Sequence, residues 1–380
     1  MKNQLNNDIF SVLIPDGESV YTILVLRCLG QIKNINIYVL ANQPWVVSRF
    51  SRYTTQFFCY SKLSGEKGRI NEINKIIRKK KIDIILPVDE ALIHLLSKQR
   101  EKLEKDIPIA PIPNTEVFEI AQDKWLLAEW LKKEQLSSPP AILFQYDVTF
   151  SASLSLLTFP VLLKPAYGGG GFGIRLFENA AELINFCKEF NAREKHIIQS
   201  FIYGYDIGCN VLCKDGKILA YTIQKGFINA NRPFCSSSNL DFYEDENVLR
   251  FVSKVIAKLK WTGVVNFDLR YDEKENQLMV IEMNPRYWAS LLGSLATGIN
   301  FPYLACILGL NRELPIVKAK PIRFVQAKVA LKIMFKRIFN TKHTGEYFDH
   351  STIDFFKKDP LPKAMEGFLK IYNHIFVRDN

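Results

Sequence analysis

Two stretches of the sequence combine residue types that could bind a phosphorylated ligand and a divalent metal ion. The first, residues 159–174, begins with an apolar run that ends in Lys164. It is followed by a flexible loop with five glycines: Gly168, Gly169, Gly170, Gly171 and Gly173. Glycines let the backbone approach a ligand and turn N–H groups towards it, and lysine supplies a compact positive charge. The pair suits a polyphosphate, although a glycine-rich surface turn is the alternative.

The second stretch, residues 263–286, predicts a β-hairpin with acids inside apolar strands. Asp268 lies near the middle of the first strand, whereas Glu282 and Asn284 are two residues apart in the second and share a face. If the strands pair antiparallel, Asp268 joins that face, and two carboxylates with an amide oxygen suit Mg²⁺. Arg286 lies just beyond and could neutralise an anionic oxygen. The alternative is a solvent-facing polar edge.

Size and composition indicate an ordinary globular protein with two or three domains. The chain has 380 residues, of which 48% are hydrophobic and 23% are charged. No apolar run approaches the ~18–20 residues that cross a bilayer, and the polar N-terminus lacks a signal-peptide core. We therefore expect a soluble cytoplasmic protein without a transmembrane segment.

The net charge and the cysteines do not change this expectation of a soluble cytoplasmic protein. The formal charge is +11, but the basic residues occur in short scattered groups, and no nucleic-acid-binding signature is present. We expect no nucleic acid partner; an RNA-binding or membrane-surface role, with the tail after residue 313 as a peripheral anchor, is the less favoured alternative. The seven cysteines are an odd, scattered set in which only Cys209 and Cys213 are close, which predicts buried, reduced thiols rather than a zinc site.

The first third of the chain alternates strand and helix signals, as parallel α/β units do. Strands are predicted at 10–14, 36–40 and 82–87, and helices at 20–29, 69–80 and 90–103. Ligands of such sheets bind at the carboxyl ends of the strands. Four acids fall there, and each could face substrate or act as a helix cap or first-turn acid: Asp16, Glu18, Asp89 and Glu90.

A proline-rich segment at 108–113 predicts a domain boundary, and the chain beyond it alternates less regularly, as in α+β folds. One helix is predicted over 115–136, with Lys124 near its middle. Further strands are predicted at 161–164, 197–201, 209–213, 218–224, 263–271 and 277–282. An amphipathic helix is predicted near 324–338.

Taken in order, the helix lysine, the strand lysine with its glycine loop, the segment 198–206 and the Asp…Glu-x-Asn-Pro-Arg hairpin resemble the ATP-grasp superfamily over residues 10–310. The segments 284–291 and 298–302 resemble the branch near carbamoyl-phosphate synthase and the carboxylate–amine ligases. The resemblance implies an α/β and α+β fold. It would comprise an N-terminal Rossmann-like (pre-ATP-grasp) domain at 1–113, a two-lobed ATP-grasp domain at 114–312, and a basic helical C-terminal extension at 313–380.

The resemblance also implies roles for individual residues. Lys124 and Lys164 would contact the ATP phosphates beneath the glycine loop, and Asp206 would bind the ribose. Arg286, with Lys164, would stabilise the transferred phosphoryl group. The adenine would be held by Gln199, Ser200, Phe201 and Ile202. Mg²⁺, for which Mn²⁺ could substitute, would be held by Asp268, Glu282 and Asn284.

Several of these residues have simpler explanations. Lys124 could be a surface helix lysine, Asp206 a turn acid and Gln199 a plain strand residue. Lys225 could contact phosphate or substrate, or could equally well have no such role. Ser200 replaces the glutamate often found in the family.

Two further positions bear on the choice of branch and acceptor. Asn266 stands where the dipeptide-ligase branch has arginine, a role that Arg286 could take. The loop 226–241, with Arg232 and Ser236–Ser238, lies where acceptor specificity is usually set.

The implied activity is that of an ATP-dependent carboxylate–amine ligase. It would act on small-molecule substrates through an acylphosphate and release ADP and phosphate, with a thiol acceptor less favoured than an amine. A catalytically silent ATP-binding regulator or scaffold is the alternative. A homodimer is compatible with the sequence.

Overall fold

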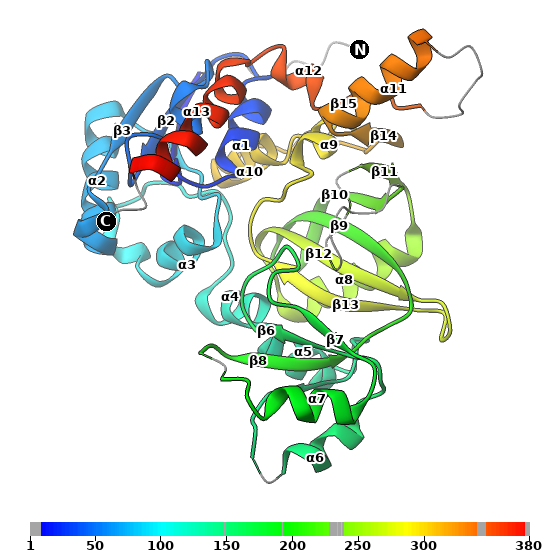
Figure 1. The fold of residues 1–380 in the computed structure, drawn as a ribbon. Coiled ribbons are helices and arrows are strands. Elements are labelled where there is room, and N and C mark those ends of the chain that lie inside the picture. The colour runs from blue at the N-terminus through cyan, green and yellow to red at the C-terminus, as the bar shows by residue number, and fades with distance from the viewer. Residues whose placement is uncertain are drawn as a thin grey trace.

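Three β-sheets organise the molecule, and helices cover them (Figure 1). The computed structural model describes residues 9–376 except 148, 192, 228–233, 235–236, 238 and 340–346. Mixed helices and sheets confirm the predicted α/β and α+β class. None of the described helices combines the length and apolarity needed to span a bilayer.

The first sheet is parallel, with strand order β3-β2-β1-β4. Its strands are β1 (Phe10–Ile14), β2 (Ile35–Ala41), β3 (Gln56–Cys59) and β4 (Ile84–Ile85), and its helices are α1 (Thr22–Leu29), α2 (Gly65–Lys80) and α3 (Glu90–Lys98). The central strand β1 is buried because its apolar residues contact helices on both faces. The sequence did not predict β3, a short and partly exposed edge strand.

The single helix predicted over 115–136 is wrong: two helices, α4 (Thr115–Gln122) and α5 (Lys124–Lys133), meet at Asp123. Asp123 is extended (φ −93°, ψ 113°), and its carboxylate accepts hydrogen bonds from the backbone N–H groups of Trp125 (2.8 Å) and Leu126 (3.2 Å). Lys195 pairs with the same carboxylate at 2.6 Å. This cap places Lys124 in the first turn of α5, where it can face a ligand.

The second sheet is antiparallel, with order β5-β8-β6-β7, and forms a separate lobe with α6 and α7 (Figure 1). Its elements are β5 (Ala141–Leu143), α6 (Phe150–Ser153), β6 (Val161–Pro165), β7 (Arg175–Phe177), α7 (Ala180–Cys187) and β8 (His196–Ser200). Its small core is rich in aromatic and branched side chains. The sheet presents the end of β6, and therefore Lys164, to the third sheet.

The third sheet has seven strands, in the order β13-β12-β9-β10-β11-β14-β15. Its elements are β9 (Gly204–Lys214), β10 (Lys217–Gly226), β11 (Leu240–Tyr243), α8 (Glu246–Leu259), β12 (Gly263–Asp272), β13 (Gln277–Asn284), β14 (Ile322–Val325) and β15 (His350–Ser351). The helix α8 packs its apolar face on β9 and β10. The segment after 313, expected as a helical extension, thus supplies two strands of this sheet.

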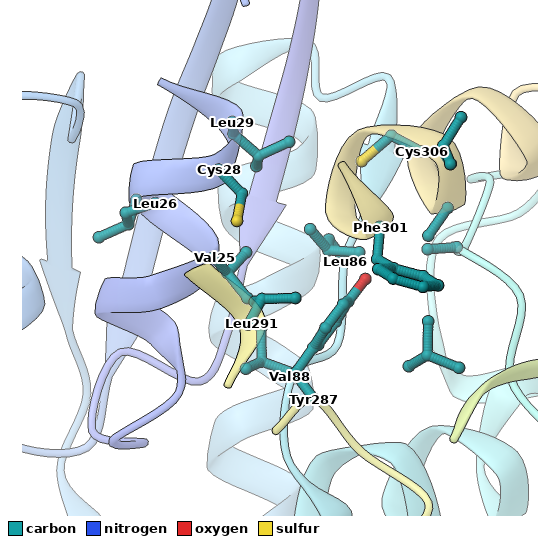
Figure 2. Close-up of a cluster of buried hydrophobic side chains, with 14 of the residues drawn as sticks. Val25, Leu26, Cys28, Leu29, Leu86, Val88, Tyr287, Leu291, Phe301 and Cys306 are labelled. Carbon is teal, nitrogen blue, oxygen red and sulfur yellow. The ribbon is translucent and has the colours of Figure 1, made fainter. Parts of the chain in front are cut away.

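A shared apolar core joins the N-terminal sheet to the chain that follows the hairpin (Figure 2). Tyr287 and Leu291 pack against Val25 of α1 and Val88, and Phe301 lies beside them. The helices involved are α9 (Leu291–Ala296) and α10 (Phe301–Gly309). This core also includes Phe324 and Phe355, so it crosses both predicted boundaries, 113 and 312. These boundaries remain predictions.

The C-terminal segment folds back onto the N-terminal domain. It contains α11 (Ala327–Phe339), α12 (Ile353–Phe356) and α13 (Leu361–Phe376). Asp359, just before α13, is fully buried and accepts hydrogen bonds from Ser51 Oγ (2.8 Å) and Arg52 N (3.0 Å), while Arg27 lies at 3.7 Å. These contacts attach the segment to the first domain.

The cysteines within the described part of the chain are free thiols. Cys28, Cys187, Cys209, Cys213 and Cys306 are buried, as expected. Cys59, on the edge strand β3, is exposed, so the expectation of burial is wrong there.

Candidate functional site

A cavity of about 720 Å³ lies between the second and third sheets. Its walls come from β6, the glycine loop and β8 on one side, and from β9, β10, β12 and β13 on the other. Most of the predicted site residues line it: Lys124, Lys164, Gly168, Gly169, Gly170, Gly171, Gln199, Ser200, Phe201, Ile202, Asp206, Lys225, Asp268 and Glu282. Gly173, Asn284 and Arg286 are not part of its lining. Asn284 and Arg286 contact residues of the hairpin just behind the wall.

The glycine loop approaches the carboxylates of the hairpin. Gly168, Gly170, Gly171 and Gly173 have φ values of 91°, 70°, 74° and 74°, a region that favours glycine. A Cβ atom added to Gly169 would lie 3.6 Å from Glu282 Oε1 and 3.8 Å from an Arg286 nitrogen. The backbone at Gly169 therefore lies close to the hairpin carboxylate Glu282.

The hairpin places its acids side by side. Asp268 lies directly opposite Glu282 in the antiparallel register, and a bulge follows in β13. Asn284 Nδ2 donates to Asp268 Oδ2 at 3.3 Å. Burial raises the pKa of Asp268 above its usual value, and the charge of Glu282 adds to the shift. Two carboxylates thus share a poorly solvated space, an arrangement that a cation would relieve.

The donor chemistry fits a hard cation. Among the described residues no cluster of three His, Cys, Asp or Glu side chains occurs, so a third ligand here would be an amide oxygen. Asn284 Oδ1 is that oxygen, and it now accepts a hydrogen bond from Arg286 Nη2 at 2.9 Å. Carboxylate and amide oxygens are the ligands that Mg²⁺ and Mn²⁺ accept.

Two lysines, Lys124 and Lys164, lie near the carboxylates of the hairpin. Lys124 Nζ donates to Gly168 O and lies 3.5 Å from Glu282 Oε1. Lys164 is only 3% exposed and donates to Gln199 Oε1 at 2.7 Å. Burial lowers the pKa of Lys164 to about 8, and the positive charge of Lys124 adds to the effect. A polyanion beside Lys164 would favour its charged form.

Arg286 bridges the hairpin and the N-terminal domain. Its Nε atom lies 3.0 Å from Glu90 Oε1, and its guanidinium carbon lies 4.6 Å from the ring centroid of Tyr21. Sequence reasoning placed Glu90 near a crevice but missed Tyr21, which follows an ordinary turn and carries no motif. The two contacts fix the guanidinium beside Asn284.

The remaining acids at the ends of the parallel strands have structural roles. Asp16 is buried and accepts hydrogen bonds from Val88 N and Arg69 Nη2, both at 2.7 Å. Burial raises its pKa to about 6, although Arg69 opposes the shift. Asp89 caps α3 by accepting from Glu90 N at 2.8 Å. Glu18 pairs with Arg69 at 3.1 Å.

The segment expected to hold the nucleoside lines the cavity, and several of its polar groups already have partners. Ser200 Oγ accepts from Thr158 N at 2.9 Å. Arg270 donates to Ile202 O and to Asp206 Oδ1, both at 2.6 Å. The Asp206 carboxylate is 61% exposed, so it is accessible to a ribose.

Lys225 also lines the cavity. Its Nζ lies 5.3 Å from the Tyr243 ring centroid. Within the loop 226–241, Arg232, Ser236 and Ser238 lie outside the described residues.

A buried polar chain behind the hairpin was missed from the sequence. Asn284 Nδ2 donates to Asn266 Oδ1 (3.1 Å), Asn266 Nδ2 to Asn210 Oδ1 (2.9 Å), and Asn210 Nδ2 to Thr222 Oγ1 (3.0 Å), which contacts Ser294 Oγ (3.0 Å). All five are buried. Both Asn284 amide hydrogens therefore point at protein acceptors, and its oxygen accepts from Arg286. A signal was present, because Asn210 interrupts an apolar strand.

Comparisons with known proteins agree with this geometry. A family model described as an ATP-grasp domain matches residues 121–290. The carbamoyl phosphate synthase large chain of Clostridium botulinum is 26% identical over 283 residues, which are 71% of this chain and 25% of that protein. The chain thus spans about a quarter of the length of this relative.

Solved structures extend the similarity beyond the matched segment. The N5-carboxyaminoimidazole synthetase of Staphylococcus aureus, complexed with ADP, superposes with a TM-score of 0.64 at 16% identity, covering 84% of this chain and 83% of that one. The biotin carboxylase domain of Hydrogenobacter thermophilus 2-oxoglutarate carboxylase gives 0.61 at 20% identity, covering 82% and 72%. At these identities the likeness shows the fold. Residues 121–290 are thus similar to an ATP-grasp domain in sequence, and most of the chain shares the fold of these solved structures.

Proposed function

We propose that the chain is an ATP-dependent ligase that joins a small-molecule carboxylate to an amine and releases ADP and phosphate. The observation that carries the proposal is the approach of the Gly169 backbone to Glu282, with Lys124 and Lys164 beside them. Cations, a flexible backbone and paired carboxylates in one cavity suit a nucleoside triphosphate with its metal ion. The neighbours solved with ADP and with its magnesium salt support this assignment.

ATP would lie along the cavity between the two sheets. Its phosphates would contact Lys124 and Lys164 under the loop of Gly168–Gly171 and Gly173. The base would lie against residues 199–202 and the ribose near Asp206. Asp268, Glu282 and Asn284 would hold Mg²⁺, which when bound supplies positive charge to the phosphate oxygens. Lys225 would lie at the end where the acceptor enters.

The reaction would proceed in two displacements. A carboxylate oxygen of the substrate attacks the γ-phosphorus while the bond to the ADP oxygen breaks, which gives an acylphosphate. The amine nitrogen then attacks the acyl carbon, phosphate leaves and the amine loses a proton. Lys164 and Arg286 stabilise negative charge on the transferred group, and the closed glycine loop excludes water from the acylphosphate.

The test is ADP release by the purified chain with a panel of carboxylates, each with and without amine acceptors. With an active substrate, Glu282→Gln should lower the rate by about 10²-fold or more, because the metal ion would lose one of its two carboxylate ligands. Glu273→Gln, an exposed acid in the turn of the same hairpin, is the matched control and should keep full activity.

Two outcomes would contradict the proposal. Equal activity of Glu282→Gln and the control would remove the metal site from the reaction. ATP binding without ADP release across the whole panel would favour a silent nucleotide-binding regulator.

A further inference from the structure

The helix α11 carries large apolar side chains on its solvent side. Its inner face is anchored, because Ala330 is fully buried and Ile333 is 4% exposed. Leu331, Met334 and Phe335 are 58%, 46% and 65% exposed. Their spacing of three and four residues places them on one face. Figure 1 shows α11 in orange at the periphery, beyond the third sheet.

A row of lysines runs beside this apolar stripe. Lys328, Lys332 and Lys336 are four residues apart, and the first two are exposed. They belong to the segment 318–342, which contains eight basic residues and no acid, in a chain whose formal charge is +11. Among them, Arg323 pairs with Asp241 at 2.7 Å, and Lys336 and Arg337 also have interaction partners. Much of the net charge is therefore concentrated around one helix.

The base of the helix is held by the sheet. Gln326 N donates to Asn239 Oδ1 at 3.1 Å, and Ala327 N donates to Thr352 Oγ1 at 2.8 Å. β14, which leads into α11, pairs with β11. The orientation of the exposed face is thus set by the fold, and the helix needs no rearrangement to present it.

We propose that α11 is a docking surface for an anionic lipid bilayer. The helix would lie in the plane of the headgroups, with Leu331, Met334 and Phe335 inserted among the acyl chains and Lys328 and Lys332 on the lipid phosphates. Aromatic and aliphatic residues on one side and lysines on the other are the composition of interfacial helices. A protein partner fits less well, because lysine is depleted from the centres of protein interfaces.

The binding energy would come from two sources that an experiment can separate. Burial of apolar side chains in the interface does not depend on salt, whereas attraction of lysines to anionic lipid does. One lysine near such a surface contributes about fivefold in affinity at moderate ionic strength. Raising the salt from about 0.1 M to about 1 M shortens the screening length from about 10 Å to about 3 Å and should weaken binding strongly.

The test is co-sedimentation of the full chain with vesicles. Vesicles that contain phosphatidylglycerol should bind the protein, and pure phosphatidylcholine vesicles should not. The double variant Leu331→Gln with Lys332→Gln should lose about tenfold or more in affinity, because it removes one inserted side chain and one charge. Leu63→Gln with Lys62→Gln is the matched control, since Leu63 is 98% exposed beside an exposed lysine in the N-terminal domain.

Three results would overturn the proposal. The first is absence of binding to phosphatidylglycerol vesicles by the wild-type chain. The second is equal binding by the two double variants, each shown to be folded by circular dichroism. The third is a dimer in analytical ultracentrifugation that only the Leu331/Lys332 variant disrupts, with no vesicle binding, since the stripe would then contact a second copy of the chain.

Discussion

Replacement of Asn266 by leucine tests whether the buried polar chain orients Asn284 in the proposed metal site. Leucine has the same branching as asparagine but offers neither donor nor acceptor. Asn210 Oδ1 would lose its 2.9 Å partner, and Asn284 Nδ2 would lose its 3.1 Å partner. Each lost bond leaves a buried polar atom, at about 1–3 kcal/mol apiece. The free energy of unfolding should therefore fall by about 2–6 kcal/mol in a urea titration.

The effect on function should be separable from this loss of stability. With one amide hydrogen released, Asn284 can rotate and present its nitrogen instead of its oxygen to the cation. Partners behind metal ligands typically contribute about 10–100-fold in metal affinity. We expect the Mg²⁺ concentration for half-maximal ADP release to rise by about tenfold or more in Asn266→Leu.

Thr222→Val is the matched control. It removes a hydroxyl that contacts Asn210 at 3.0 Å and Ser294 at 3.0 Å. The break is at Asn210, which is two hydrogen bonds away from Asn284 along the same polar chain. It should destabilise the protein without changing the Mg²⁺ requirement. The reasoning fails if both variants, at equal loss of stability, shift the Mg²⁺ requirement equally, or if neither does.

Two further predictions concern stability. Tyr287→Phe should leave the free energy of unfolding unchanged or raise it by up to about 2 kcal/mol, because the buried Tyr287 hydroxyl finds no hydrogen-bond partner among the described residues; a clear loss in urea denaturation would contradict this. For Asp16, the pKa rises from 3.8 in the unfolded chain to about 6 in the fold, so the folded state retains a proton that the unfolded state releases. Its contribution is therefore complete below the unfolded pKa and is lost as the pH rises to about 6, by up to about 3 kcal/mol. The free energy of unfolding of the wild type should therefore fall relative to that of Asp16→Asn as the pH rises over that range. A difference that does not change with pH would refute the assignment.

Local signals made the hairpin predictable from the sequence. Strand alternation alone requires Glu282 and Asn284 to share a face, and a hairpin turn brings Asp268 opposite them. The lysine at the end of β6 follows from the apolar run before it. Such features depend on a few neighbouring residues, so tertiary context has little opportunity to override them.

Features that depend on distant partners were not predictable. Neither glycine nor proline marks the break at Asp123; the carboxylate caps α5 and meets Lys195 from another part of the chain. The strands β14 and β15 are short, and their pairing partners lie far away in sequence. The contact of Arg286 with Tyr21 and Glu90 likewise requires the two domains to pack as they do.

The pairing of β14 with β11 decides how the chain can be shortened. A fragment that stops at residue 312 would leave β11 with a row of unsatisfied backbone groups along an open sheet margin, a template for aggregation. It would also strip Asp359 from Arg27, which would remain as a charge enclosed in protein. Expression of residues 1–312 alone should therefore give insoluble material, and a shortened version of this protein should keep the chain through Asp359.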